Sequence, residues 1–362
     1  MTAQPIVAHC HPFVVGVDTH ARKHVYAIVD SSNGALLDTQ SFPATSAGIN
    51  RAINWVARRT EGNADTLWVI EGAATYGAIL AGTVAAHGFP VTEAPRMDKK
   101  QNHGVGKTDA LDAHRMAMAS LPLPVDKLRH PRLNEGIRHG LRILVTARSS
   151  MTKDRTRSVN ALNALVRSND LGVDARKKLN GSQIAEVSRW REREEELSLR
   201  IARSEAVRLA KHILDLDQQL AVNEQQLNEL VKASEAAPLL AETGFKAITA
   251  AKCFVAWSHE GRVRNEAAFA CLAGVNPIPA SSGNTTPHRL NRGGDRSLNA
   301  ALHLAAVTRM THDKETRVYV EKRRAEGKTD REIRRCIKRY LVRRIFKIFS
   351  APAMVEEVPA AA

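Results

Sequence analysis

The spacing of apolar and polar residues over positions 13–115 predicts short strands that alternate with amphipathic helices. Continuous apolar runs predict buried strands, and the Asn33-Gly34 pair predicts the tight turn of a hairpin. The predicted strands cover residues 13–18, 24–30, 35–42, 67–71 and 90–94. Apolar residues three or four positions apart predict helices that begin at Thr45, Tyr76 and Thr108.

The predicted order is three strands in a meander, followed by helix, strand, helix, strand and helix. An antiparallel meander that leads into parallel strands is typical of an α/β RNase-H-like (RuvC-like) domain, which we expect over residues 13–130. The residues that precede it, 1–12, are predicted to form a disordered tail.

The composition of the chain changes after residue 130, where glycine and aromatic residues become rare. Apolar residues recur three to seven positions apart among charges, which predicts a helical coiled-coil arm over 131–238 with its turn at 168–184. The apolar positions of its second helix are Leu197, Ile201, Val207, Leu209, Ile213, Leu216, Leu220, Leu227 and Leu230. A mainly α-helical domain is predicted over 239–350, and a disordered tail over 351–362.

The net charge of the chain is +15 at pH 7, and its pI is about 10.0. Like charges in such excess repel one another, so this balance indicates a polyanionic partner. The sequence shows no apolar run of membrane-spanning length and no signal peptide, which favours nucleic acid over a membrane and a bacterial cytoplasmic, nucleoid-associated location. The four cysteines lack metal-binding spacing, which predicts reduced thiols and no zinc site.

Four acidic residues stand where they could share one site: Asp18, Glu71, Asp109 and Asp112. The first two end predicted strands, and the last two are three positions apart on one helix face. If the two strands are adjacent, all four carboxylates meet at one edge of the sheet. Such a cluster requires cations at neutral pH, and oxygen ligands select Mg²⁺ or Mn²⁺. Taken singly, each would be an ordinary turn, cap or surface residue, but their order in a basic chain favours a metal site.

The motifs around these residues resemble those of the DEDD transposases of the insertion-sequence one-ten family. The first group of matching segments is G-V-D-T-H-x-x-K-H, V-I-E-G-A-A-T-Y and G-K-T-D-A-L-D-A-H-R. The second group is F-A-C-L-A-G-V-N-P-I-P-A-S-S-G-N followed by R-L-N-R-G-G-D-R-S-L-N-A-A-L-H. The family's N-terminal domain is similar to the Holliday-junction resolvase RuvC, and its C-terminal domain bears a serine.

The resemblance implies a DNA transposase or recombinase that cuts and rejoins donor and target DNA. It implies that the four acidic residues bind Mg²⁺ and that Ser282 attacks the DNA backbone to form a phosphoserine intermediate. The family assembles as an oligomer in which the serine of one subunit completes the carboxylate site of another. It also uses an RNA from the element as a guide, so a homo-oligomer (dimer or tetramer) and a guide RNA are expected partners.

Ser282 lies in a polar loop near arginines and glycines. Serines in such a loop are ordinarily solvated or capping residues, but nearby arginines could bind a scissile phosphate and stabilise its transition-state charge. Ser281 precedes it directly, and the spacing from Pro277 favours Ser282 as the nucleophile. The residues expected to bind nucleic acid are Arg289, Arg292, Arg296, Arg331, Arg334, Arg335, Lys338 and Arg339.

The last five of these residues belong to a basic segment, 328–347, whose apolar residues recur at helical spacing. A helix on a membrane surface would show the same pattern, and phosphate contact is the preferred interpretation. Two further functions stay open: a RuvC-like nuclease in which water attacks, and a non-enzymatic nucleic-acid binder with a decayed site. The intact carboxylates argue against decay, and a covalent protein–DNA adduct distinguishes the transposase from the nuclease.

Overall fold

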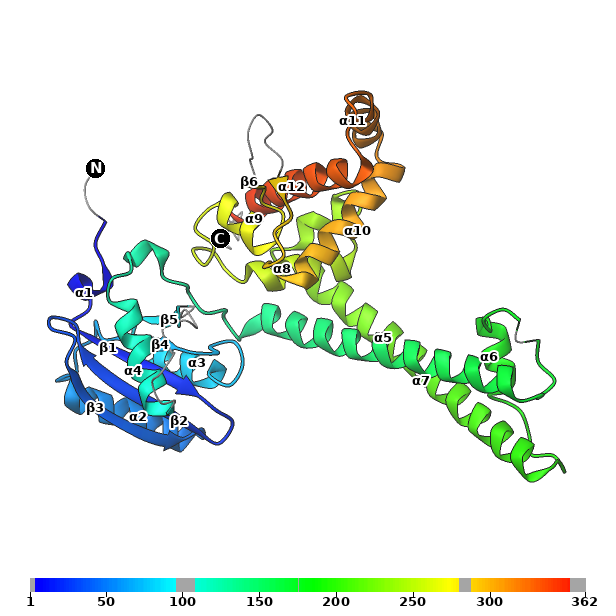
Figure 1. The fold of residues 1–362 in the computed structure, drawn as a ribbon, viewed down its shortest axis with the longest axis horizontal. Helices are drawn as coiled ribbons and strands as arrows, with labels where there is room; N and C mark the ends of the chain where they lie inside the picture. Colours follow the sequence, from blue (N-terminus) through cyan, green and yellow to red (C-terminus); the bar gives the residue numbers. More distant parts are fainter. Residues whose placement is uncertain (1–3, 96–107, 175, 280–287, 352–362) are drawn as a thin grey trace, which may run out of the picture. The chain divides into compact units, whose positions relative to one another are not determined.

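The computed structural model describes residues 4–95, 108–174, 176–279 and 288–351 (Figure 1). The chain divides into two compact units, Met1–Asn134 with Ser258–Arg262 and Glu135–Trp257 with Val263–Ala362. The finer division of the second unit into an arm and a C-terminal domain stays a prediction, and the tail predicted at 351–362 lies almost entirely outside the described residues.

The N-terminal unit contains a five-stranded mixed sheet of order β3-β2-β1-β4-β5. Its strands are β1 (Phe13–Thr19), β2 (Lys23–Asp30), β3 (Leu36–Pro43), β4 (Leu67–Ile70) and β5 (Val91–Glu93). β2 runs antiparallel to both of its neighbours, whereas β1, β4 and β5 are parallel to one another. The predicted mixed α/β domain is therefore confirmed, with its meander and its parallel strands.

Helices cover both faces of this sheet (Figure 1). They are α2 (Ser46–Arg59), α3 (Ala78–Ala86) and α4 (Asp109–Ser120). Side chains alternate along a strand, so Val15 and Val17 of β1 pack against α2 and α3 while Val14 packs against α4. Burial on both faces explains why the central strands are continuous apolar runs in the sequence.

Residues 4–12 are ordered, so the prediction of a disordered tail was wrong for them. They include the short helix α1 (Val7–Cys10), and the side chain of Val7 is fully buried. The Val7 amide donates to the Leu123 carbonyl oxygen at 2.9 Å, shortly before the 3-10 helix η2 (Val125–Lys127). The segment is too short for a periodic pattern, and its order comes from contact with a distant part of the chain.

Two long helices of the second unit pack side by side in opposite directions (Figure 1). They are α5 (Gly136–Ser168) and α7 (Leu197–Lys232), and α6 (Gly181–Val187) lies between them in the chain. Arg148 Nη1 donates to the Leu220 carbonyl oxygen at 2.9 Å, and Arg155 Nη2 donates to Asp217 Oδ2 at 3.0 Å. The two predicted helices are thus present, and coiled-coil packing stays a prediction. The additional helix α6 begins within the predicted turn and extends beyond it.

The packing face of α7 differs from the predicted one at its start. Leu197 and Ile201 are 59% and 60% exposed, whereas Ala202, Ala206 and Ala210 are buried. These alanines are four positions apart and therefore share one face of the helix. The prediction counted only large apolar side chains and missed a stripe of small ones.

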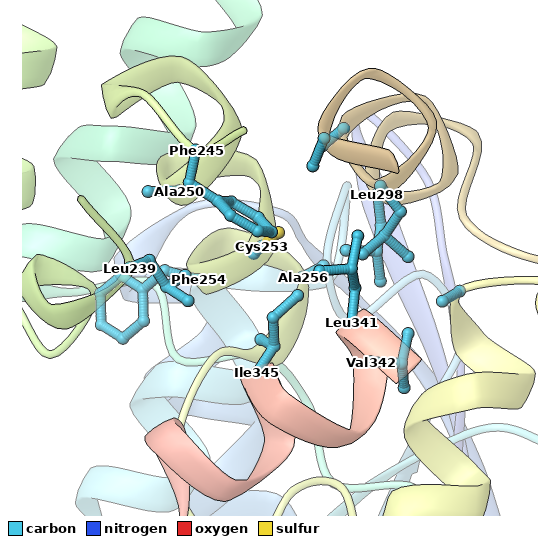
Figure 2. Close-up of a cluster of buried hydrophobic side chains, with 14 of the residues drawn as sticks. Leu239, Phe245, Ala250, Cys253, Phe254, Ala256, Leu298, Leu341, Val342 and Ile345 are labelled. Atoms are coloured by element: carbon cyan, nitrogen blue, oxygen red, sulfur yellow. The ribbon is translucent and has the colours of Figure 1, made fainter. Parts of the chain in front are cut away.

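The other elements of this unit enclose a second hydrophobic core. They are η3 (Ala237–Ala241), α8 (Ala247–Trp257), α9 (Glu266–Leu272), β6 (Ile278–Pro279), β7 (His288–Arg289), α10 (Arg296–His312), α11 (Lys314–Ala325) and α12 (Asp330–Phe349). Phe254 of α8, Leu298 of α10 and Leu341 of α12 belong to this core, and Figure 2 shows their side chains gathered together with Ile345. The predicted apolar face of the basic helix is therefore confirmed as its core-facing side.

Leu341→Ala should lower the free energy of unfolding of this unit by about 2–5 kcal/mol, because it removes buried methyl groups and leaves a cavity. Val318→Ala is the matched control, since Val318 on α11 is 72% exposed and its loss should cost less than about 0.5 kcal/mol. Urea denaturation of both variants measures the difference. Equal stability of the two would show that α12 is not part of the core.

Candidate functional site

Asp18 and Glu71 meet at the carboxyl ends of two adjacent parallel strands. β1 and β4 pair with Val17 opposite Ile70, so the residues that follow share one edge of the sheet. The Glu71 amide donates to the Val17 carbonyl oxygen at 3.0 Å, and the Thr19 hydroxyl donates to the Glu71 carbonyl oxygen at 2.9 Å. These bonds hold the backbone of Glu71 beside the end of β1.

The turn after Glu71 reverses the chain at once. Gly72 has φ +58°, in the left-handed region that favours glycine, and the Thr75 hydroxyl donates to the Gly72 carbonyl oxygen at 3.1 Å. The chain therefore leaves the sheet edge directly after the carboxylate, and Glu71 stays exposed there.

Helix α4 supplies the other two predicted carboxylates from its first turn. The Thr108 hydroxyl accepts a hydrogen bond from the Leu111 amide at 3.2 Å and caps the helix, which starts where the sequence predicted. Asp109 and Asp112 follow immediately, where the positive end of the helix dipole favours negative charge.

Gly16 allows α4 to lie directly on the backbone of β1. A Cβ atom at this position would lie 2.0 Å from the Ala113 carbonyl oxygen and 2.9 Å from the Ala117 nitrogen. No side chain fits in that space, so the close approach of the two elements requires glycine. Because β1 carries Asp18 two residues later, the first turn of α4 reaches the same sheet edge.

The carboxylates influence one another electrostatically. Asp18 is buried, with 6% of its surface exposed, and the Asp112 side chain is 15% exposed. Desolvation, followed by the charges of Asp18 and Asp112, raises the pKa of Glu71 above its usual value. The structure thus brings these three residues together, as the sequence predicted from adjacent strands.

His20 joins this group, although the sequence analysis did not single it out. Its Nε2 atom lies 3.2 Å from Asp18 Oδ2 and 3.6 Å from Asp109 Oδ1. Among the described residues, Asp18, His20 and Asp109 have ligand atoms within 4.8 Å of one another. The available signal was the D-T-H sequence, because residues two apart at the end of a strand point to the same side.

The donor set fits a hard divalent cation. Desolvation, and then the charges of Asp18 and Asp112, raise the pKa of Glu71, and a cation would stabilise such a group of carboxylates. The imidazole of His20 adds a nitrogen atom within 4.8 Å of ligand atoms of Asp18 and Asp109. Arg115 Nη1 lies 3.5 Å from Asp112 Oδ1 and provides part of the positive charge at this edge.

The predicted serine lies outside the described residues, as does Ser281. Both belong to the connection between β6 and β7, which pair with Ile278 opposite Arg289. Three of the predicted nucleic-acid contacts follow this connection and are exposed: Arg289, Arg292 and Arg296.

The basic residues of α12 differ in their surroundings. Arg331 and Arg335 are exposed, and Arg334 is half-buried. Lys338 is only 8% exposed, and its ammonium group donates to Asn299 Oδ1 at 2.7 Å. The Arg339 side chain forms an ion pair with Glu266 of α9. The predicted basic face therefore includes both free and partnered cations.

Nothing in the described part of the chain has the length and hydropathy of a membrane-spanning helix.

Two family models match the chain. One, described as Transposase, matches residues 15–169, and the other, described as Transposase IS116/IS110/IS902 family, matches residues 236–321. The insertion element IS900 uncharacterized 42 kDa protein of Mycobacterium paratuberculosis is 26% identical over 88% of this chain and 90% of its own length. The insertion element IS110 uncharacterized 43.6 kDa protein of Streptomyces coelicolor is 34% identical over 33% of this chain and 30% of its own length.

Gly16→Ala should displace α4 from β1 and lower the free energy of unfolding by about 1–3 kcal/mol, since the new methyl group meets backbone atoms that cannot move aside. Gly82→Ala in α3 is the control, because a Cβ there meets nothing within 4 Å and should be neutral or slightly stabilising. Thermal denaturation compares the two variants. A Gly16→Ala protein as stable as Gly82→Ala would contradict the close approach.

Proposed function

We infer that the chain is a DNA transposase of the IS116/IS110/IS902 family, and we propose that it cuts and rejoins DNA with a divalent-cation site and a serine nucleophile. The observation that supports this proposal best is the convergence of Asp18, Glu71 and Asp112 at the carboxyl ends of β1 and β4. The strand order β3-β2-β1-β4-β5 with an antiparallel β2 supports an RNase-H-like (RuvC-like) fold for this unit.

In this proposal Asp18, Glu71, Asp109 and Asp112 hold Mg²⁺ or Mn²⁺. A cation bound there would neutralise charge on a DNA phosphate and lower the pKa of an attacking hydroxyl. The protein's task is to hold the carboxylates in place. The main-chain bonds of Glu71 and the contact of His20 with Asp18 serve that purpose.

Ser282 is the proposed nucleophile. Its hydroxyl oxygen loses a proton and bonds to phosphorus, while the bond from phosphorus to one DNA oxygen breaks and that oxygen leaves with a proton. The resulting phosphoserine conserves the phosphodiester, so a hydroxyl of the recipient strand can reverse the step and rejoin DNA. Exposed Arg289, Arg292 and Arg296 follow the serine in the chain and are proposed to contact the phosphates.

A guide RNA and assembly into a dimer or tetramer complete the proposal. They rest on the family resemblance of the motifs, and the net charge of +15 is consistent with two polyanionic partners. The remaining basic residues proposed for nucleic-acid contact are Arg331, Arg334, Arg335, Lys338 and Arg339 of α12.

Asp18→Asn should reduce DNA cleavage in Mg²⁺ by more than about a hundredfold. Losing even a residue that only hydrogen-bonds to a metal ligand lowers metal affinity or activity about ten- to a hundredfold. DNA binding should remain, since the variant keeps the shape of the side chain. Asp174→Asn is the control, because Asp174 lies between α5 and α6 and pairs with Arg176. Cleavage of labelled DNA measures the effect, and normal activity of Asp18→Asn would exclude the carboxylate site.

Ser282→Ala should still bind DNA but form no covalent adduct, because it lacks the attacking oxygen. Ser281→Ala, one position away, should retain the adduct. A denaturing gel of protein incubated with labelled cognate DNA shows the adduct as a shifted band. A band that persists in Ser282→Ala and disappears in Ser281→Ala would identify the other serine. Clean cleavage by the unmodified protein without any adduct would favour a nuclease in which water attacks.

A further inference from the structure

A cavity of about 800 Å³ lies in the second unit, within the size range of pockets that enclose a small molecule. Its walls come from α11, α12, strand β7 and the turn Gly274–Pro277 that leads into β6. The cavity therefore adjoins both ends of the connection that contains Ser282, and described residues alone line it.

One face of α12 forms a wall of this cavity. Arg335, Arg339 and Arg343 line it at intervals of four residues, on the side of the helix away from the core. Arg339 and Arg343 both approach Glu266, whereas Arg335 forms no ion pair with any residue that the structure describes. Its charge acts on Glu332, which also lines the cavity, but the two form no ion pair, so the guanidinium of Arg335 can still bind an anion.

Lys338 adds a buried cation to the same cavity. Its ammonium donates to Asn299 Oδ1, and no carboxylate among the described residues lies within 4.0 Å of it. An ammonium has three donors, so a single amide oxygen leaves donors for a further acceptor. Asn299 Nδ2 in turn donates to the Ala273 carbonyl oxygen at 2.7 Å, which ties Lys338 to the turn before β6.

Two aromatic side chains, Tyr319 and Tyr340, line the cavity beside these cations. Tyr340 is 51% exposed, whereas Tyr319 is 37% exposed and has the Arg323 guanidinium over its ring, 5.8 Å from the centroid, so Tyr340 is the better stacking surface. Cations that bind a phosphate, next to aromatic rings on which a base can stack, are the two elements of single-strand recognition.

We propose that this cavity binds one nucleotide of the DNA strand next to the phosphodiester that the serine attacks. Arg335 and Lys338 bind the phosphate of that nucleotide, and its base stacks on Tyr340. The proposal rests on the proposed function for the choice of DNA and for the role of Ser282. Held in this way, the nucleotide is unstacked from its neighbours, and the strand is fixed beside the β6–β7 connection.

Binding of a fluorescent single-stranded oligo(dT) to the full-length protein, measured by anisotropy at constant salt, tests the cavity. Arg335→Ala should weaken binding about tenfold or more through loss of a charge-assisted hydrogen bond. Arg317→Ala is the matched control, because Arg317 is exposed on α11, does not line the cavity and is not among the proposed nucleic-acid contacts. Its loss should change binding less than about threefold.

Tyr340→Ala should weaken binding about fivefold or more, and Tyr340→Phe should bind like the unmodified protein because it keeps the ring. Equal losses in Arg335→Ala and Arg317→Ala, or unchanged binding by Tyr340→Ala, would overturn the pocket and indicate diffuse attraction to a basic surface. The same variant can be tested with an oligo(U) RNA. If Tyr340→Ala weakened binding of oligo(U) more than binding of oligo(dT), the assignment to DNA would be overturned.

Adduct formation by the unmodified protein tests the proposed serine nucleophile, and oligo(dT) binding tests the cavity, so the two proposals can fail independently. An adduct at Ser282 together with unchanged oligo(dT) binding by Tyr340→Ala would reject the pocket alone. Selective loss of binding in Arg335→Ala and Tyr340→Ala, with no adduct in the unmodified protein, would reject the serine nucleophile and keep the pocket.

Discussion

The close contact between α4 and β1 at Gly16 determines the geometry of the candidate site. Ala113 and Ala117 of the helix lie so near the strand backbone that only glycine fits opposite them. With the helix in this position, its first turn lies over the edge where β1 and β4 end. Acidic residues from the ends of two strands and from one helix can therefore act on one another electrostatically, although almost a hundred positions separate them along the chain.

An acidic site and a basic cavity occur in different units of the molecule. In the N-terminal unit, desolvation and then the charges of Asp18 and Asp112 raise the pKa of Glu71, which favours a bound cation. In the second unit, arginines and lysines exceed acidic residues on the cavity side of α12. A transposase needs both environments, because a DNA phosphate must be attracted to the protein and its negative charge must be neutralised where bonds change.

Helix α12 stabilises its unit and forms part of a binding surface at the same time. Ile333, Ile337 and Leu341 lie in the core, and the arginines two positions after each of them line the cavity. Lys338 lies between these two faces, which explains why a residue counted as part of a basic surface is buried and bonded to Asn299. The spacing of apolar residues predicts that α12 has an apolar face and a basic face. It does not predict which side chains from other helices bury a residue, such as Lys338, that lies between the two faces.

The sequence by itself determined the elements that depend on neighbouring residues: the strands that end near Asp18 and Glu71, the helix start at Thr108 and the shared face of Asp109 and Asp112. Local sequence suffices there because the repeat of apolar side chains along a helix or strand, and the capping of a helix, depend on residues only a few positions apart. Only the tertiary structure decided that His20 lies against Asp109, that Val7 is buried, and that Arg335 faces a cavity. These properties depend on contacts between residues far apart in the chain, which apolar spacing does not encode.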